Sequence, residues 1–120
     1  MLPAAHRLRS SREFTEVVRR GRRAGRPTLT VHLLPGGPAT SAATEPTGAA
    51  RAGLVVSKAV GGSVVRHQVS RRLRHLLRDR IAVLPLGTRL VVRAAPGAAT
   101  ATSADLGADL DAALSRLVRR

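Results

Sequence analysis

Residues 53–80 read GLVVSKAVGGSVVRHQVSRRLRHLLRDR, and this stretch decides the fold of the chain. Its apolar start predicts a strand that ends near Ser57 and Lys58, and the glycine pair at 61–62 interrupts it. The remainder follows the 3.6-residue period of an α-helix, with an apolar and a basic stripe on opposite sides. The apolar stripe comprises Val65, Val69, Leu73 and Leu76, and the basic stripe comprises His67, Arg71, Arg74 and Arg78.

The charges on this helix indicate a bound polyanion rather than a merely solvated surface. Asp79 is the only acid between Arg51 and Arg80, so almost no i,i+4 ion pairs can form. We expect Ser63 to be the N-cap, which places Arg66 in the first turn, where a cation opposes the helix dipole. A phosphate at this end would remove that conflict, because backbone N–H groups and the guanidinium would bind the same anion.

The composition indicates one nucleic-acid-binding domain over residues 1–120. The chain carries 21 basic residues, of which Lys58 is the only lysine, and its net charge is +14. Such a charge is typical of binding to nucleic acid rather than to membranes or acidic proteins. No apolar stretch is long enough to span a membrane, no signal peptide opens the chain, and cysteine is absent. We therefore expect a cytoplasmic protein.

The first half of the chain predicts a helix followed by a strand. Ser10-x-x-Glu13 is a capping box that opens a helix ending at Gly21. The expected buried face of this helix comprises Phe14, Val17 and Val18. Alternation over residues 28–34 predicts a strand with Leu29, Val31 and Leu33 on one face. Residues 35–50 are rich in Gly, Pro, Ala and Thr and predict a flexible loop.

The second half completes an α+β two-layer sandwich with the order α-β-β-α-β-α. Strands are expected over residues 52–57 and 89–94, on either side of the basic helix and a turn at 85–87. Residues 96–103 predict a flexible connection, and residues 105–118 predict the last helix. The apolar face of that helix comprises Leu106, Leu110, Ala113, Leu114 and Leu117.

We identify no catalytic or metal-binding residues in the sequence. The four histidines lack the spacing of metal ligands, and no serine lies in a G-x-S-x-G elbow. Asp105, Asp109 and Asp111 are expected to stabilise the N-terminal half of the last helix rather than to act as acids or bases. These features predict a binding protein.

The basic helix and its flanks resemble the protein subunit of bacterial ribonuclease P. That family has a strand ending V-S-K and a helix of the type G-x-A-V-x-R-N-x-x-K-R-x-x-R. The matching residues here are Val56-Ser57-Lys58, then Gly61 to Val65, and Arg66-His67-Gln68-Val69-Ser70-Arg71-Arg72-Leu73-Arg74. Arg7-Leu8, Ser10-x-x-Glu13-Phe14 and Gly21-Arg22 resemble the family's opening helix, and Leu90 to Ala94 with Pro96 resembles its last long strand. The resemblance thus covers most of the chain in order. His67, Ser70 and Ala59 depart from the usual Asn, Lys and Lys.

The resemblance implies a function and a set of binding residues. In that family the RNA subunit is the catalyst and acts with Mg²⁺, held mainly by RNA, to remove the 5′ leader of precursor tRNA. This chain would then be the protein subunit of a tRNA 5′-processing endoribonuclease, and we expect no DNA or membrane partner. The residues implied to contact catalytic RNA are Lys58, Arg66, His67, Arg71, Arg72, Arg74 and Arg78.

The same resemblance places the leader in a cleft between the sheet and the opening helix, with Arg7, Arg9 and Phe14 as its contacts. Val18 and Thr28 stand where the family commonly has aromatic residues. A Phe14 side chain could stack on a base or could simply anchor its helix. The resemblance also implies a left-handed crossover from the second strand through the basic helix to the third, against the usual preference.

Two other classes of protein share part of this pattern. A structural RNA-binding protein, such as a small ribosomal protein, would have the same charge and the same lack of catalytic groups. The order of motifs along the whole chain argues against it. A basic DNA-compacting protein fits less well, because the predicted strands are broken by Pro and Gly and the only binding motif is of an RNA type.

Overall fold

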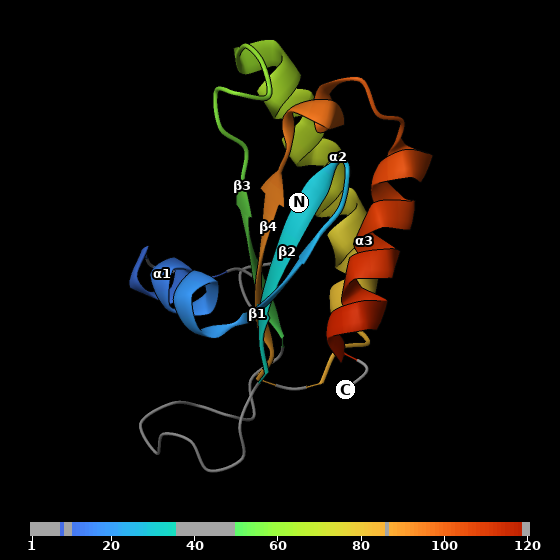
Figure 1. Ribbon diagram of the computed structural model, residues 1–120. Helices are drawn as coiled ribbons and strands as arrows, with labels where there is room; N and C mark the ends of the chain where they lie inside the picture. Colours follow the sequence, from blue (N-terminus) through green and yellow to red (C-terminus); the bar gives the residue numbers. More distant parts are fainter. Residues whose placement is uncertain (1–7, 9–10, 36–49, 86, 119–120) are drawn as a thin grey trace.

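The computed structural model describes residue 8 and residues 11–35, 50–85 and 87–118. Within them the chain forms three α-helices, four strands and one 3₁₀ turn (Figure 1). In chain order these are α1 (Ser11–Arg20), β1 (Arg22–Gly25), β2 (Leu29–Leu34), β3 (Arg51–Val55), α2 (Ser63–Ile81), β4 (Arg89–Ala94), η2 (Pro96–Ala99) and α3 (Ser103–Val118). The loop predicted over residues 35–50 lies outside the described residues apart from its two ends.

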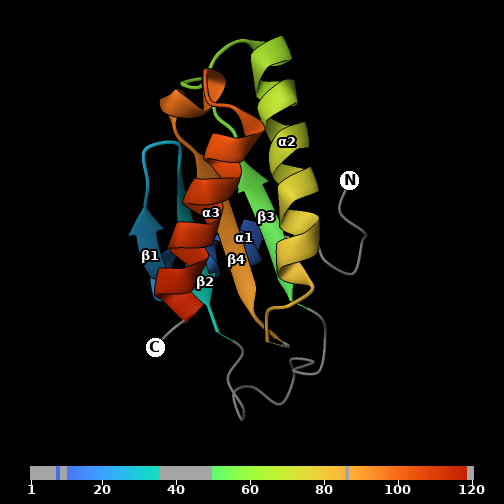
Figure 2. The ribbon, with the colours of Figure 1, turned by 90° about the vertical axis from the view of Figure 1, so that its right-hand side faces the viewer.

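The strands form one sheet in the order β1-β2-β4-β3. β2 is antiparallel to both β1 and β4, whereas β3 is parallel to β4. α2 and α3 cover one face of this sheet, and α1 lies against the other (Figures 1 and 2). The predicted α+β class is therefore confirmed, with the sheet and the α2–α3 pair as the two main layers.

The connection from β3 through α2 to β4 joins two neighbouring parallel strands. In Figure 2 the two helices of the main layer face the viewer, β3 and β4 point upward, and β4 lies to the left of β3. A right-handed connection would place β4 on the right. The connection in this view is therefore left-handed, against the general preference.

β1 is the strand that the predicted order lacks. Its residues, Arg22 to Gly25, include no β-branched or aromatic side chain, so their composition does not indicate a strand. The chain turns back because Arg26 N donates to Leu29 O at 2.7 Å. Asp109 of α3 holds this turn by accepting from Thr28 N at 3.1 Å and from Thr28 Oγ1 at 2.6 Å. β1 thus depends on the rest of the fold and not on its own sequence.

The main core lies between the sheet and the α2–α3 layer. The predicted inner face of β2 and the predicted apolar face of α3 are both buried, which confirms these two expectations. On α2, Val69 and Leu73 are buried as predicted, and Leu77 and Ile81 continue the stripe. Val65 and Leu76 are only partly buried and pack against its margin.

Two helix ends and one connection differ from the sequence-based prediction. The N-cap of α2 is Gly62, with no side-chain hydrogen bond, and Ser63 is already helical. The connection after β4, predicted to be flexible, contains the 3₁₀ turn η2, whose Ala98 side chain is fully buried. α3 begins at Ser103, two residues earlier than predicted, because Thr102 and Asp105 form a capping box. Asp105 N donates to Thr102 Oγ1 at 3.0 Å, and Thr102 N donates to Asp105 Oδ2 at 3.1 Å.

A second, smaller core holds α1 against the opposite face of the sheet. Val17 is fully buried and packs with Leu8 and Val91. The Phe14 ring lies directly over Gly53 of β3, so that a Cβ atom on Gly53 would overlap the ring. Val18, predicted to be buried, is instead 37% exposed at the edge of this contact.

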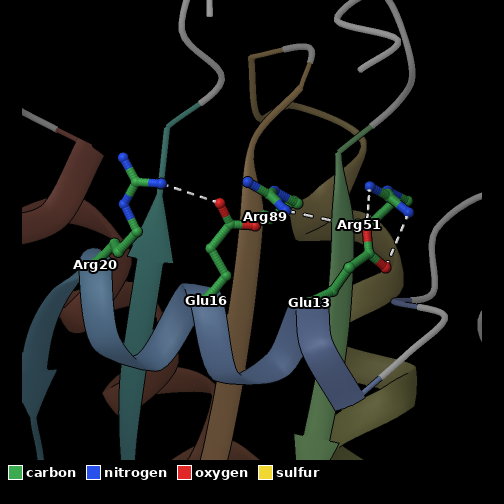
Figure 3. A network of polar contacts seen from close by, with 5 residues as sticks. All are labelled: Glu13, Glu16, Arg20, Arg51 and Arg89. Atoms are coloured by element: carbon green, nitrogen blue, oxygen red, sulfur yellow. Dashed lines mark hydrogen bonds and ion pairs between the residues drawn. The ribbon is translucent and has the colours of Figure 1, made fainter. Parts of the chain in front are cut away.

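A network of ion pairs fixes α1 over the sheet (Figure 3). Arg51 and Arg89 are directly opposite each other in the β3–β4 register, an arrangement that repels unless acids intervene. Glu13 contacts Arg51 at 2.6 Å and Arg89 at 4.0 Å, and Glu16 contacts Arg89 at 2.9 Å. The other oxygen of Glu16 contacts Arg20 at 3.2 Å. The two glutamates lie one helical turn apart, so one face of α1 can reach both arginines.

The contact between Phe14 and Gly53 yields a prediction about stability. Gly53→Ala should destabilise the fold by about 1–3 kcal/mol, because the new methyl group displaces a packed ring. Gly25→Ala in β1 is the matched control, since its new methyl would meet only ordinary van der Waals contact. Chemical denaturation of both variants measures the difference. An equal effect of the two substitutions would show that the ring does not constrain position 53.

Candidate nucleic-acid interface

The exposed face of α2 presents a row of basic side chains. His67, Arg71 and Arg78 are exposed and Arg74 is half-buried, and all four follow helical spacing on the side away from the core. Within the described part of the chain, none of these four side chains has a carboxylate partner. The structure thus confirms the predicted stripe, which we call the α2 basic row. Its side chains lie on one rigid helix and have no acidic partner among the described residues.

Two other predicted contacts of α2 lie away from this row. Arg72 points toward η2 and α3, where its Nη1 donates to Ala101 O at 3.3 Å. Arg66 lies in the first turn, and its Nε donates to Gly61 O at 3.2 Å. Arg72 therefore has a structural contact that the motif alone did not indicate, whereas Arg66 remains near the helix start.

Lys58 lies in the turn between β3 and α2. The turn is closed by Val60 N donating to Ser57 O at 3.0 Å and by Gly61 N donating to Lys58 O at 3.1 Å. β3 ends at Val55, so Lys58 stands beyond the strand rather than at its end. Its side chain is exposed beside the N-terminus of α2, where an anion would also meet free backbone N–H groups.

A hollow of about 260 Å³ lies between α1 and the sheet, where the sequence predicted a cleft. The Phe14 ring, Val55 and Val91 give it an apolar lining, and Arg19 and Arg93 bring positive charge to it. Thr15 and Val18 complete its wall. Phe14 therefore packs on Gly53, as an anchor of its helix would, and also lines the hollow, where stacking on a base remains a prediction.

The other residues predicted for the cleft behave differently. Thr28 is buried and bonded to Asp109 toward α3, so it does not line the hollow. Arg7 and Arg9 lie outside the described residues. The sequence analysis missed Arg93, although the alternation of β4 would have placed it with Val91 on the face opposite Leu90 and Val92.

The acids of α3 contradict the prediction that all three stabilise the start of that helix. Only Asp105 does so. Hydrogen bonds from Thr28, with smaller contributions from Arg26, lower the pKa of Asp109. Asp111 accepts from Arg80 Nε at 2.6 Å, and this hydrogen bond raises the pKa of Arg80. Both aspartates are therefore tertiary contacts that join α3 to the β1–β2 turn and to α2.

The described residues contain neither a metal-binding cluster nor a membrane-spanning helix. No group of three or more His, Asp or Glu side chains among them could hold a metal ion. No helix that the structure describes combines the length and apolar character needed to cross a membrane.

The amino-acid sequence is similar to that of known proteins of one family. The model of the family described as Ribonuclease P matches residues 2–118. The "Ribonuclease P protein component" of Streptomyces avermitilis is 59% identical over 118 residues, which cover 98% of this chain and 96% of that protein. The protein of the same description from Corynebacterium diphtheriae is 48% identical over 120 residues, covering 100% and 99%.

The chain belongs to the ribonuclease P protein family. Solved structures of the family share its fold. The RNase P protein from Thermotoga maritima superposes with a TM-score of 0.70 at 22% identity, covering 96% of this chain and 97% of that one. A Staphylococcus aureus RNase P protein superposes with a TM-score of 0.75 at 18% identity, covering 94% and 97%. The identification from the helix motif is therefore confirmed.

The different surroundings of Arg71 and Arg72 generate a prediction. Arg71→Ala should leave the free energy of unfolding within about 0.5 kcal/mol of wild type, because its side chain is exposed and unpaired. It should weaken binding to ribonuclease P RNA and make the slope of log K against log salt shallower by up to about 0.9. Arg72→Ala should instead lower the free energy of unfolding by about 1 kcal/mol through its lost hydrogen bond.

Denaturation and salt-dependent binding of both variants measure these effects. Loss of stability in Arg71→Ala, with Arg72→Ala unaffected, would reverse the assignment of the two neighbours.

Proposed function

We propose that this chain is the protein subunit of a ribonuclease P ribonucleoprotein, binding the catalytic RNA through the α2 basic row and the 5′ leader of precursor tRNA in the hollow beside α1. The observation that carries this proposal is the unneutralised α2 basic row in a chain of this family. The assembled particle would remove the leader and produce the mature 5′ end of tRNA in the cytoplasm. DNA and membranes are not among its expected partners.

The α2 basic row suits the backbone of a folded RNA. Its arginines stand on one side of a rigid helix and have no acid to displace before they bind phosphate. Arginine binds phosphate through two parallel N–H groups, and release of counterions from the RNA adds affinity at low salt. Lys58 and Arg66 extend this surface around the start of α2, while His67 can donate to a phosphate or a 2′-hydroxyl.

The hollow beside α1 suits a single strand rather than a duplex. The Phe14 ring and the neighbouring valines offer an apolar surface for a base, and Arg19 and Arg93 lie where they can meet the backbone phosphates. The bases of a duplex are paired and stacked on one another, so only an unstacked base of a single strand could lie against this apolar surface. Mature tRNA has no leader, so this site would distinguish the precursor from the product.

Catalysis and Mg²⁺ binding would reside in the RNA subunit. Among the described acids, Glu13, Glu16, Asp109 and Asp111 are bound to arginines, Asp105 caps α3, and Asp79 lies exposed on α2. No three of the described acids come close enough together to hold a metal ion. Such a set does not fit a protein Mg²⁺ site, which needs several oxygen ligands around one point.

The leader site is tested by Phe14→Leu. The substitution keeps an apolar side chain against Gly53 but removes the ring, so the assembled enzyme should lose about 1–3 kcal/mol of affinity for precursor tRNA, a factor of about 5 to 100. Affinity for mature tRNA should not change. Equilibrium binding of both tRNAs to the ribonucleoprotein, formed with an excess of protein, measures the two values.

Arg71→Ala serves as the comparison, because any effect it has acts through assembly and should therefore be the same for both tRNAs. If Phe14→Leu also weakened both ligands equally, the ring would act on folding or assembly instead. Unchanged affinity for both would make Phe14 a packing residue only.

A further inference from the structure

His32 is a buried polar side chain without a partner. It lies on β2 on the α1 side of the sheet and is 6% exposed, and its Nδ1 atom has no hydrogen-bond partner among the described residues. Its Nδ1 atom is sealed from solvent. Buried polar atoms in folded proteins are almost always bonded, so this exception calls for a physical explanation. Because Nδ1 is enclosed, Nε2 is the atom through which His32 can meet a ligand.

Two unpaired arginines flank this histidine. The register places Arg23 of β1 directly opposite His32, and on the other side Val91 of β4 is its partner, with Arg93 two residues further along β4. Both arginines are exposed, and neither has a carboxylate partner among the residues described. Three neighbouring strands thus bring three basic groups together on one face.

Among the residues that the structure describes, no free acid balances these groups. The acids that α1 brings to this face, Glu13 and Glu16, are bound to Arg51, Arg89 and Arg20. Burial lowers the pKa of His32, and the nearby charges of Arg93 and Arg23 lower it further. The histidine is therefore held neutral, and an anion is the group that this surface lacks.

We propose that Arg23, His32 and Arg93 bind one phosphate of a single-stranded RNA, with the two guanidiniums pairing with its oxygens and His32 Nε2 donating a hydrogen bond. The inference deepens the proposed function, since Arg93 also lines the hollow beside α1 and a strand leaving that hollow would cross this face toward β1. The site adds a phosphate contact to the base contact at Phe14.

Binding of RNA at this site should be coupled to the uptake of a proton by His32. A bound phosphate opposes the field of the two arginines, which is one of the causes that lower the pKa of His32, so we expect this pKa to be higher in the complex than in the free protein. A ligand that raises a pKa binds more tightly as the pH falls through the higher value, and the gain levels off below the lower value. Affinity for single-stranded RNA should therefore rise on acidification within about pH 5–8.

The test uses the full chain and a short oligouridylate. An NMR titration of the His32 ring proton should give a higher pKa with saturating oligouridylate than without it. Arg23→Gln should weaken oligouridylate binding about tenfold by removing one charge-assisted contact. Arg22→Gln removes the same charge one residue earlier, on the other side of the strand, and should change affinity less than about twofold. An unchanged His32 pKa in the complex, or equal effects of Arg22→Gln and Arg23→Gln, would overturn the phosphate site.

Failure of the phosphate site and failure of the proposed leader binding would give different results. If the wild-type ribonucleoprotein prefers precursor over mature tRNA but His32 does not titrate differently on binding, the phosphate site is wrong and leader binding stands. If the wild-type particle shows no such preference while oligouridylate still shifts His32, the leader assignment is wrong and the phosphate site stands.

Discussion

A shortage of carboxylates constrains this fold, because 21 basic residues must be placed around only seven acids. In the described part of the chain, four of the acids lie where two elements meet. Glu13 and Glu16 join α1 to the neighbouring arginines of β3 and β4, and Asp109 and Asp111 join α3 to the β1–β2 turn and to α2. Without them, these contacts would bring like charges or unsatisfied hydrogen-bond donors together, and the positions of both helices would lose their electrostatic support.

This distribution divides the basic residues into two classes. Arg51, Arg80 and Arg89 are partly buried and paired with acids, so they belong to the fold. Among the described residues, the α2 basic row and the Arg23–Arg93 pair have no acidic partner, and these are the two surfaces that we propose for RNA contact. The same physical rule then underlies both the stability of the fold and the proposed function: where the described chain supplies no acid, we expect the ligand to supply the negative charge.

Much of this could be predicted from the sequence, because local periodicity controls the long elements. The stripes of α2 and α3 and the inner face of β2 follow from spacing alone. β1 could not be predicted, since Arg22 to Gly25 form a strand only through pairing with β2 and through Asp109. The contact of Arg72 with Ala101 could not be predicted, because a motif records side-chain type whereas this contact depends on how η2 packs. His32 could not be singled out from the sequence, since only the register reveals that two arginines flank it.

We expect pairing with acids, and not position in a basic segment, to decide which arginines bind RNA. The salt dependence of the affinity for ribonuclease P RNA in Arg74→Gln and Arg89→Gln measures this, because the two substitutions remove one identical charge from each class. The slope of log K against log salt should be shallower by up to about 0.9 for Arg74→Gln and unchanged from wild type for Arg89→Gln. An equal reduction in the two variants, or a reduction confined to Arg89→Gln, would contradict it.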